Sequence, residues 1–126
     1  MTATLQPAEI TVCPVARLVP GRGVAALLPD GRQVAMFLLA DGGVHALCNI
    51  DPVGRAAVMS RGLVGDRGGV PVVLSPLGKQ AYALEDGRCL DDEEVGLTVF
   101  PARIDDGEVV VSTDAIVRHH ERINAA

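Results

Sequence analysis

The sequence predicts an all-β domain, a small sandwich or barrel of short antiparallel strands, from two observations. Short segments rich in Val and Leu recur at regular intervals, and Asp-Gly dipeptides begin at Asp30, Asp41, Asp86 and Asp106. Asp-Gly favours the positive φ angles of tight hairpin turns, so the segments on either side of each dipeptide are expected to pair. Regularly spaced short strands with turn signals between them are typical of sandwiches and barrels.

Eight strands are expected in chain order. They cover residues 9–15, 24–28, 33–39, 44–48, 70–74, 80–84, 98–104 and 108–112. The second follows Gly21-Arg22-Gly23, which begins a G-x-G-x-x-A pattern. A strand and a turn follow that pattern instead of a helix, so a hairpin corner is expected there and not a dinucleotide site. The third is almost wholly apolar and is expected to be buried on both faces, whereas polar and apolar residues alternate most clearly in 98–104.

The stretch 51–69 differs from the rest of the chain. It holds five Gly and one Pro, and no strand of usable length is expected in it. A loop this long in a compact domain is usually functional.

The chain has 126 residues, which indicates one domain. The expected divisions are an N-terminal tail at 1–8, the domain at 9–113, and a C-terminal helix or tail at 114–126 that Thr113 or Asp114 would cap. The first twenty residues show no signal peptide, and the longest apolar run, 34–40, is far too short for a membrane helix. Three cysteines without a CxxC pair fit a reducing compartment, so the cytoplasm is the expected location.

Composition argues against nucleic-acid binding. The net charge is −5 and aromatic residues make up 2% of the chain, so neither phosphate neutralisation nor base stacking is favoured. The acidic run Asp91–Glu94 is either a solvated loop or an edge that meets a basic partner. His45 is expected to pack within a strand, and the adjacent His119 and His120 point too far apart on a helix to share a metal.

Two segments contain the pattern of paired metal-ligand loops without the ligands. They read Cys48-Asn49-Ile50-Asp51-Pro52, continuing to Ser60-Arg61-Gly62, and Ser75-Pro76-Leu77-Gly78-Lys79-Gln80. They resemble the cluster loops of a Rieske iron–sulfur domain, where a Cys-x-His pair and a Cys-Pro-x-His pair hold two irons. The resemblance places the ligand positions at Cys48, Ile50, Ser75 and Gly78. One sulfur among the four cannot hold a two-iron cluster, so no metal, cofactor or catalytic residue is expected in this chain.

The resemblance extends over residues 10–112 and includes Gly87-Arg88-Cys89-Leu90. Its details look like one branch, the small subunit of the assimilatory NAD(P)H-dependent nitrite reductase, which has the Rieske fold without the cluster. In that family the large subunit carries FAD, sirohaem and an iron–sulfur cluster, and it reduces nitrite to ammonium. The resemblance therefore implies a non-catalytic subunit whose partner is that large subunit, with no membrane or nucleic-acid partner.

In a Rieske domain the ligand loops protrude at one tip. This tip, or the neighbouring 51–69 stretch, is expected to dock on the large subunit. The candidate contacts are Asn49, Asp51, Arg55, Arg61 and Lys79, although the same side chains could instead hold the turns of the loops together. Two alternatives stay open. One is a free-standing, cluster-free Rieske-like interaction module, and the other is a Rieske-type electron-transfer ferredoxin, which needs ligands that the sequence lacks. The sequence does not distinguish NADH from NADPH and does not give the stoichiometry.

Overall fold

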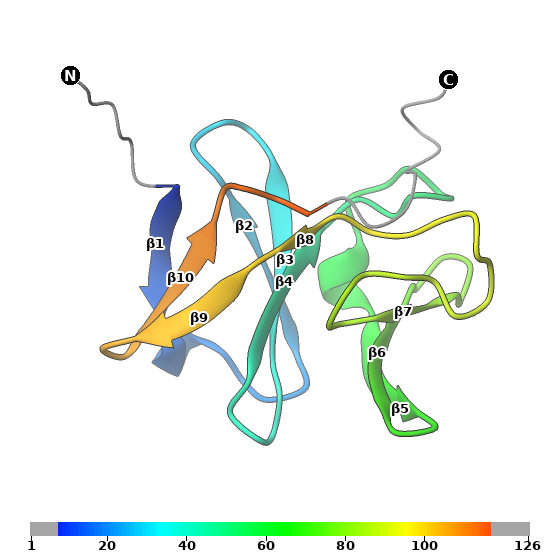
Figure 1. Ribbon diagram of the computed structural model, residues 1–126, viewed down its shortest axis with the longest axis horizontal. Coiled ribbons are helices and arrows are strands. Elements are labelled where there is room, and N and C mark those ends of the chain that lie inside the picture. Colours follow the sequence, from blue (N-terminus) through cyan, green and yellow to red (C-terminus); the bar gives the residue numbers. More distant parts are fainter. Residues whose placement is uncertain (1–7, 117–126) are drawn as a thin grey trace.

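The computed structural model describes residues 8–116 and shows three small antiparallel sheets standing side by side (Figure 1). The elements in chain order are β1 (Glu9–Pro14), η1 (Val15–Arg17), β2 (Gly23–Leu27), β3 (Gln33–Leu38), β4 (Val44–Cys48), η2 (Met59–Arg61), β5 (Leu63–Arg67), β6 (Val70–Leu74), β7 (Ala81–Ala83), β8 (Val99–Phe100), β9 (Ala102–Asp105) and β10 (Glu108–Ser112). The strand orders are β1-β10-β9, β2-β3-β4-β8 and β5-β6-β7, with the four-stranded sheet in the middle (Figure 1). The predicted all-β fold is confirmed.

Strand β3 lies between two hydrophobic cores. Val34 and Met36 pack into the core shared with the β1-β10-β9 sheet, while Ala35 and Phe37 pack into the core shared with the β5-β6-β7 sheet. All four side chains are fully buried. Because successive side chains of a strand point to opposite faces, a strand covered on both sides must be apolar throughout. The prediction that this strand is buried on both faces is confirmed.

The Asp-Gly turns act as predicted between β9 and β10. Asp106 and Gly107 have φ angles of 53° and 78°, and the flanking residues Asp105 and Glu108 are paired. Two consecutive residues with positive φ make the turn whose twist matches that of the strands it joins. Asp30-Gly31 and Asp41-Gly42 likewise stand between paired strands, β2 with β3 and β3 with β4.

The expectation that 51–69 contains no strand is wrong, because β5 forms there. It pairs with β6 along its whole length, from Leu63 opposite Leu74 to Arg67 opposite Val70. Gly68 and Gly69 make the connecting turn with positive φ angles of 62° and 92°. This edge strand has few apolar residues, so its formation depends on the main-chain hydrogen bonds to β6. For that reason the composition of the segment does not predict a strand.

The expected strand 98–104 is divided into β8 and β9 at Pro101. Val99 and Phe100 pair with β4, whereas Ala102 onwards pairs with β10 in a different sheet. Proline has no N–H for a ladder hydrogen bond, so it is tolerated where a chain leaves one sheet for the next. Proline therefore marks the point where the chain passes from the middle sheet to its neighbour.

The segment after β10 bends at Thr113 and Asp114 and is not helical as far as the structure describes it, so the predicted helix does not begin at Asp114. The Ile116 N–H donates to the Val99 carbonyl at 2.7 Å, and the Thr113 hydroxyl donates to the Ala8 carbonyl instead of capping a helix. The rest of the expected C-terminal helix, with His119 and His120, lies outside the described residues.

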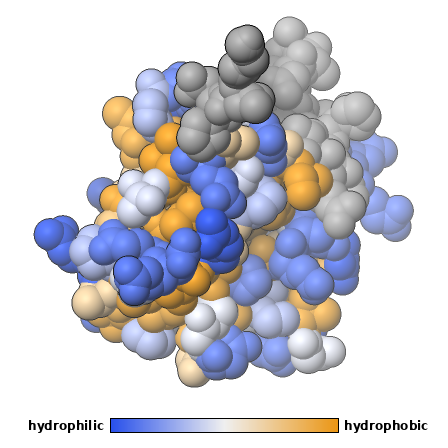
Figure 2. All heavy atoms as spheres, turned by 60° about the vertical axis from the view of Figure 1, so that its left-hand side comes forward, coloured by the Kyte–Doolittle hydropathy of each residue, from blue (hydrophilic) through white to orange (hydrophobic). Residues whose placement is uncertain are grey.

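The surface beside the β1-β10-β9 sheet is mixed in polarity. Figure 2, turned to bring this side forward, shows hydrophilic residues over much of the face with apolar ones between them. Arg103 on β9 forms ion pairs there with Glu9 and Asp105, and its side chain is half exposed. Exposed pairs of this kind contribute little to stability.

Candidate functional site

The two loops that carry the Rieske resemblance lie against each other. The first loop, residues 49–62, runs from β4 to β5, and the second loop, residues 75–80, joins β6 to β7. The Ser75 hydroxyl in the second loop donates a hydrogen bond to Oδ2 of Asp51 in the first. Both side chains are buried, Asp51 completely. A charge-assisted hydrogen bond between buried groups thus joins two loops that lie 24 residues apart in the sequence.

Asn49 holds the two ends of the first loop together. Its side-chain oxygen accepts a hydrogen bond from the Ser60 N–H at 2.8 Å, and its amide nitrogen donates to Gln33 Oε1 at 3.2 Å. Only 2% of Asn49 is exposed. The side chain thus satisfies the Ser60 N–H and the Gln33 side-chain oxygen, so its role is within the fold.

The two loops repeat the same backbone arrangement around Asp51 and Ser75. The Asp51 carboxylate accepts from the N–H two residues on, that of Val53 (2.8 Å), and the Ser75 hydroxyl accepts from that of Leu77 (3.1 Å). The Asp51 and Ser75 carbonyls each accept from the N–H four residues on, at 2.8 and 3.0 Å. Those donors belong to Arg55 and Lys79.

Arg55 and Lys79 close the repeat with matching conformations. Their φ angles are 64° and 65°, which are uncommon for residues with a side chain. A proline, Pro52 or Pro76, follows the first residue of each turn. Asp51 in the first loop is therefore the structural counterpart of Ser75 in the second.

This correspondence corrects the predicted ligand positions of the first loop. The two thiolates of a Rieske centre bind the same iron, so their positions must adjoin. Asp51 adjoins Ser75 and so meets that requirement. If Asp51 stands at the cysteine position of a Cys-x-His pair, then Val53 stands at the histidine position. Cys48 instead pairs with Val34 in the sheet, and its side chain lines a cavity with Ile50. The geometry therefore does not support Cys48 and Ile50 as ligand positions, and Ser75 and Gly78 stay the predicted positions of the second pair.

An iron–sulfur cluster does not fit the four positions that the geometry identifies. Asp51 and Ser75 offer hard oxygen atoms that are already hydrogen-bonded to each other, and Val53 and Gly78 offer no donor atom. A two-iron cluster requires soft thiolates and imidazoles at these places. Across residues 8–116, no group of three or more His, Cys, Asp or Glu side chains is placed to hold a metal ion.

Tyr82 lies beneath the loops in an apolar environment. Its side chain is fully buried in the core that also contains Met59 and Val73. Burial, and next the negative charge of Asp51, raise the pKa of the Tyr82 phenol well above its usual range. The phenol therefore stays protonated at physiological pH.

The outer surface of the loops is both apolar and cationic. Val53 is 50% and Leu77 51% exposed. Leu77 lies on the backbone of Gly54, where an added Cβ would come within 2.5 Å of Leu77 Cδ1. Arg55 and Lys79 are exposed beside them.

The five predicted contact residues therefore divide into two groups. Arg55, Arg61 and Lys79 are exposed and stay candidates for contact with a partner. Asn49 and Asp51 are buried, so the prediction that their side chains touch a partner is wrong. Polar residues in a loop pattern do not reveal whether they face solvent or the backbone they support.

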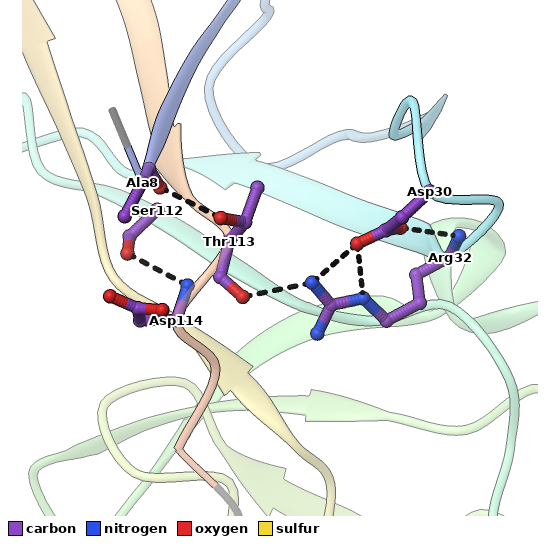
Figure 3. A network of polar contacts seen from close by, with 6 residues as sticks. All are labelled: Ala8, Asp30, Arg32, Ser112, Thr113 and Asp114. Carbon is purple, nitrogen blue, oxygen red and sulfur yellow. Dashed lines mark hydrogen bonds and ion pairs between the residues drawn. The ribbon is translucent and has the colours of Figure 1, made fainter. Parts of the chain in front are cut away.

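The sequence analysis missed Arg32, which connects two sheets. Its guanidinium pairs with Asp30 at 2.6 Å and donates to the Thr113 carbonyl at 2.8 Å (Figure 3). It also lies 5.1 Å from the centre of the Phe100 ring. The Asp30 carboxylate has a lowered pKa, first because it accepts this side-chain hydrogen bond. Arg32, Phe100 and Thr113 also line the cavity of about 690 Å³ that Cys48 and Ile50 face. The Asp30-Gly31-Arg32 sequence is a turn signal that does not disclose these distant partners.

The comparisons with known proteins agree with this geometry. The family model of the Rieske-like [2Fe-2S] domain matches residues 10–112. The nitrite reductase (NADH) small subunit of Salmonella typhimurium is 42% identical over 99 residues, which are 78% of this chain and 91% of that protein. A crystal structure described as the NADH-dependent nitrite reductase small subunit of Mycobacterium tuberculosis superposes with a TM-score of 0.80 at 55% identity, covering 86% of this chain and 95% of that one.

A longer relative also matches. The nitrite reductase [NAD(P)H] large subunit of Klebsiella oxytoca is 38% identical over 110 residues, 87% of this chain. This chain spans only 11% of the length of that large subunit. With the fold, the paired loops and these relatives in agreement, the chain belongs to the Rieske-like domain family and, within it, to the nitrite reductase small subunits.

Proposed function

We propose that this chain is the non-catalytic small subunit of a cytoplasmic NAD(P)H-dependent nitrite reductase of nitrate assimilation and that it docks on the large subunit. The Ser75–Asp51 hydrogen bond is the main observation in favour of a subunit without its own redox role. It occupies the two positions where a Rieske centre has thiolates. Electron transfer through this chain would need a cofactor, and the two loops contain none of the thiolates and imidazoles that hold a two-iron cluster. FAD, sirohaem and an iron–sulfur cluster are expected in the partner, which would reduce nitrite to ammonium.

The Klebsiella large subunit supports a close association. A stretch of that protein is 38% identical to 110 residues of this chain, so one polypeptide there contains both parts. A domain that is covalently joined to its partner in one organism is expected to bind the corresponding partner when it is a separate chain. The exposed cations of the two loops, Arg55, Arg61 and Lys79, are the proposed contacts.

The test is a pull-down of the tagged chain from nitrate-grown cells, with an absorbance spectrum of the eluate and an untagged strain as the control. A large partner with flavin and sirohaem bands is the expected result. A chain purified alone that shows iron and the bands of a two-iron cluster would instead indicate a ferredoxin. A colourless chain without a partner would indicate a free-standing interaction module.

A further inference from the structure

The two loops together form a compact surface of mixed chemistry. We call the surface of Val53, Gly54, Arg55, Leu77 and Lys79 the tip. Leu77 from the second loop packs on Gly54 of the first, so the tip is continuous across both loops. Val53 and Leu77, the structural counterparts in the repeat, place two half-exposed aliphatic side chains at its centre.

The tip is held in shape before any partner binds. Arg55 and Lys79 are fixed in the left-handed region by hydrogen bonds from their N–H groups to the Asp51 and Ser75 carbonyls. The buried Asp51–Ser75 contact then joins the loops underneath. A surface that needs no ordering loses less conformational entropy on association, which favours affinity.

The charge of the tip is opposite to that of the chain as a whole. The two loops contain three of the eleven Lys and Arg residues but only one of the sixteen Asp and Glu residues, and that one, Asp51, is buried. The chain carries a net charge of −5, so the positive charge of the loops is a local feature. A local potential of this kind selects a partner surface of the other sign.

We propose that the tip is the docking surface of this subunit and that it fits an apolar hollow rimmed with carboxylates on the large subunit. Val53 and Leu77 enter the hollow, where desolvated aliphatic contact supplies most of the affinity. Arg55 and Lys79 meet the rim, where they steer association and set the orientation. This inference rests on the proposed function, because the partner is the large subunit.

The experiment measures the Kd between the purified chain and the large subunit from the same organism, at low and at moderate salt. Two variants alter the tip, Leu77→Asp and Lys79→Glu. Their controls are Val19→Asp and Arg22→Glu. Val19 is 53% exposed, almost the same as Leu77, and Arg22 is exposed like Lys79.

The control residues lie at the other end of the four-stranded sheet from the tip. Gly21, between them, donates its N–H to the Leu38 carbonyl at the end of β3, whereas Val53, Gly54 and Arg55 follow the opposite end of the sheet, beyond Cys48. The first loop returns to β2 only at Ser60, which lies against Gly23 and outside the tip. Thermal unfolding of every variant establishes that each has folded. A loss of binding can then be attributed to the altered surface.

We expect Leu77→Asp to weaken binding about 30-fold, as the loss of a central contact does. Lys79→Glu should weaken binding at low salt and reduce the dependence of Kd on salt, while both controls stay within twofold of the unaltered chain. If the unaltered chain binds and the tip variants bind equally well, the tip is not the docking surface, although the proposed function stands. If the unaltered chain does not bind, the proposed function fails and this inference with it. Self-association of the chain that Leu77→Asp abolishes would make the tip a dimer contact and overturn the proposal.

Discussion

The Ser75 hydroxyl donates to the buried Asp51 carboxylate, and each of the two residues also organises the turn of its own loop. A Rieske centre joins the same two loops through iron. Here a single hydrogen bond between side chains makes that connection. These hydrogen bonds fix the shape of the loops, and a fixed shape is what the proposed docking surface requires.

Removing the Ser75 hydroxyl is expected to destabilise the fold. Ser75→Ala takes one donor from a fully buried carboxylate, and hydrogen bonds to charged groups are worth about 1.5–3 kcal/mol. The free energy of unfolding should fall by about 2 kcal/mol, measured as a lower urea midpoint at unchanged slope. The control is Ser112→Ala, whose hydroxyl accepts a hydrogen bond from the exposed Asp114 N–H and should change stability by less than about 0.5 kcal/mol. Equal effects of the two substitutions would contradict a special role for Ser75.

Introducing cysteine and histidine into the two loops tests which residues stand at the positions of the Rieske Cys-x-His pair. A variant with Asp51→Cys, Val53→His, Ser75→Cys and Gly78→His should bind a two-iron cluster after reconstitution, measured by iron and sulfide content and by absorbance. A Cβ at Gly78 would lie 2.2 Å from Gln80 Oε1, the movable end of a side chain, so the position can accept histidine after a local shift.

The comparison variant keeps Cys48 and carries Ile50→His, Ser75→Cys and Gly78→His. It should remain colourless, because Cys48 lies in the β3–β4 ladder and lines a cavity that Ser75 does not line. If this comparison variant bound a cluster and the variant with Asp51→Cys did not, Cys48 would be the ligand position after all.

Two glycines with similar backbone angles should respond differently to alanine. Gly107 has a φ of 78° and open space where a Cβ would be, so Gly107→Ala should cost only the left-handed conformation, about 1–2 kcal/mol. Gly87 has a φ of 81°, and a Cβ there would lie 2.1 Å from the Leu97 carbonyl oxygen. Gly87→Ala must also displace backbone, so it should cost more than about 4 kcal/mol or prevent folding. Urea unfolding of both variants tests this, and an equal loss would show that the Gly87 region can relax.

His45 should make stability depend on pH near neutrality. Burial lowers the pKa of this half-buried imidazole, although the charges of Asp41 and Glu85 oppose the shift. Because the folded pKa lies below the unfolded one, the unfolded chain binds more protons as the pH falls through about 6.5. Stability is therefore complete above that pH and decreases below it.

Replacing the imidazole with a side chain that does not titrate isolates this contribution. His45→Gln should flatten the change in urea midpoint between pH 7 and pH 5.5 relative to the unaltered chain. An unchanged pH profile would mean that another group, and not His45, titrates on unfolding in this range.

Much of the fold could be predicted because it depends on local signals. Asp106-Gly107 makes its turn through the intrinsic preference of two residues for positive φ. The apolar run of β3 after Gln33 identifies a strand covered on both faces, since Val34 to Leu38 include no polar side chain. The edge strand β5 carries neither signal, because its partner β6 stabilises it.

The site was predicted less completely than the fold. The loop motifs locate it, but Asn49 and Asp51 show that a polar loop residue can serve the interior. Arg32 shows that a residue in an ordinary turn can join two sheets. Both facts depend on partners far away in the chain, which a motif does not contain.

The sequence by itself determined the β architecture and the position of the two loops, because propensity, periodicity and motif spacing are properties of neighbouring residues. Its resemblance to a known family indicated the branch of that family. Only the tertiary structure decided that Asp51, and not Cys48, faces Ser75, and that Leu77 lies on Gly54 to make one continuous tip. The pair Cys48 and Ile50 and the pair Asp51 and Val53 have the same spacing and lie three residues apart in the sequence. The sequence alone therefore could not show which pair corresponds to the Rieske ligands. The choice follows from hydrogen bonding across the loops, where burial of the Asp51 carboxylate requires donors close by.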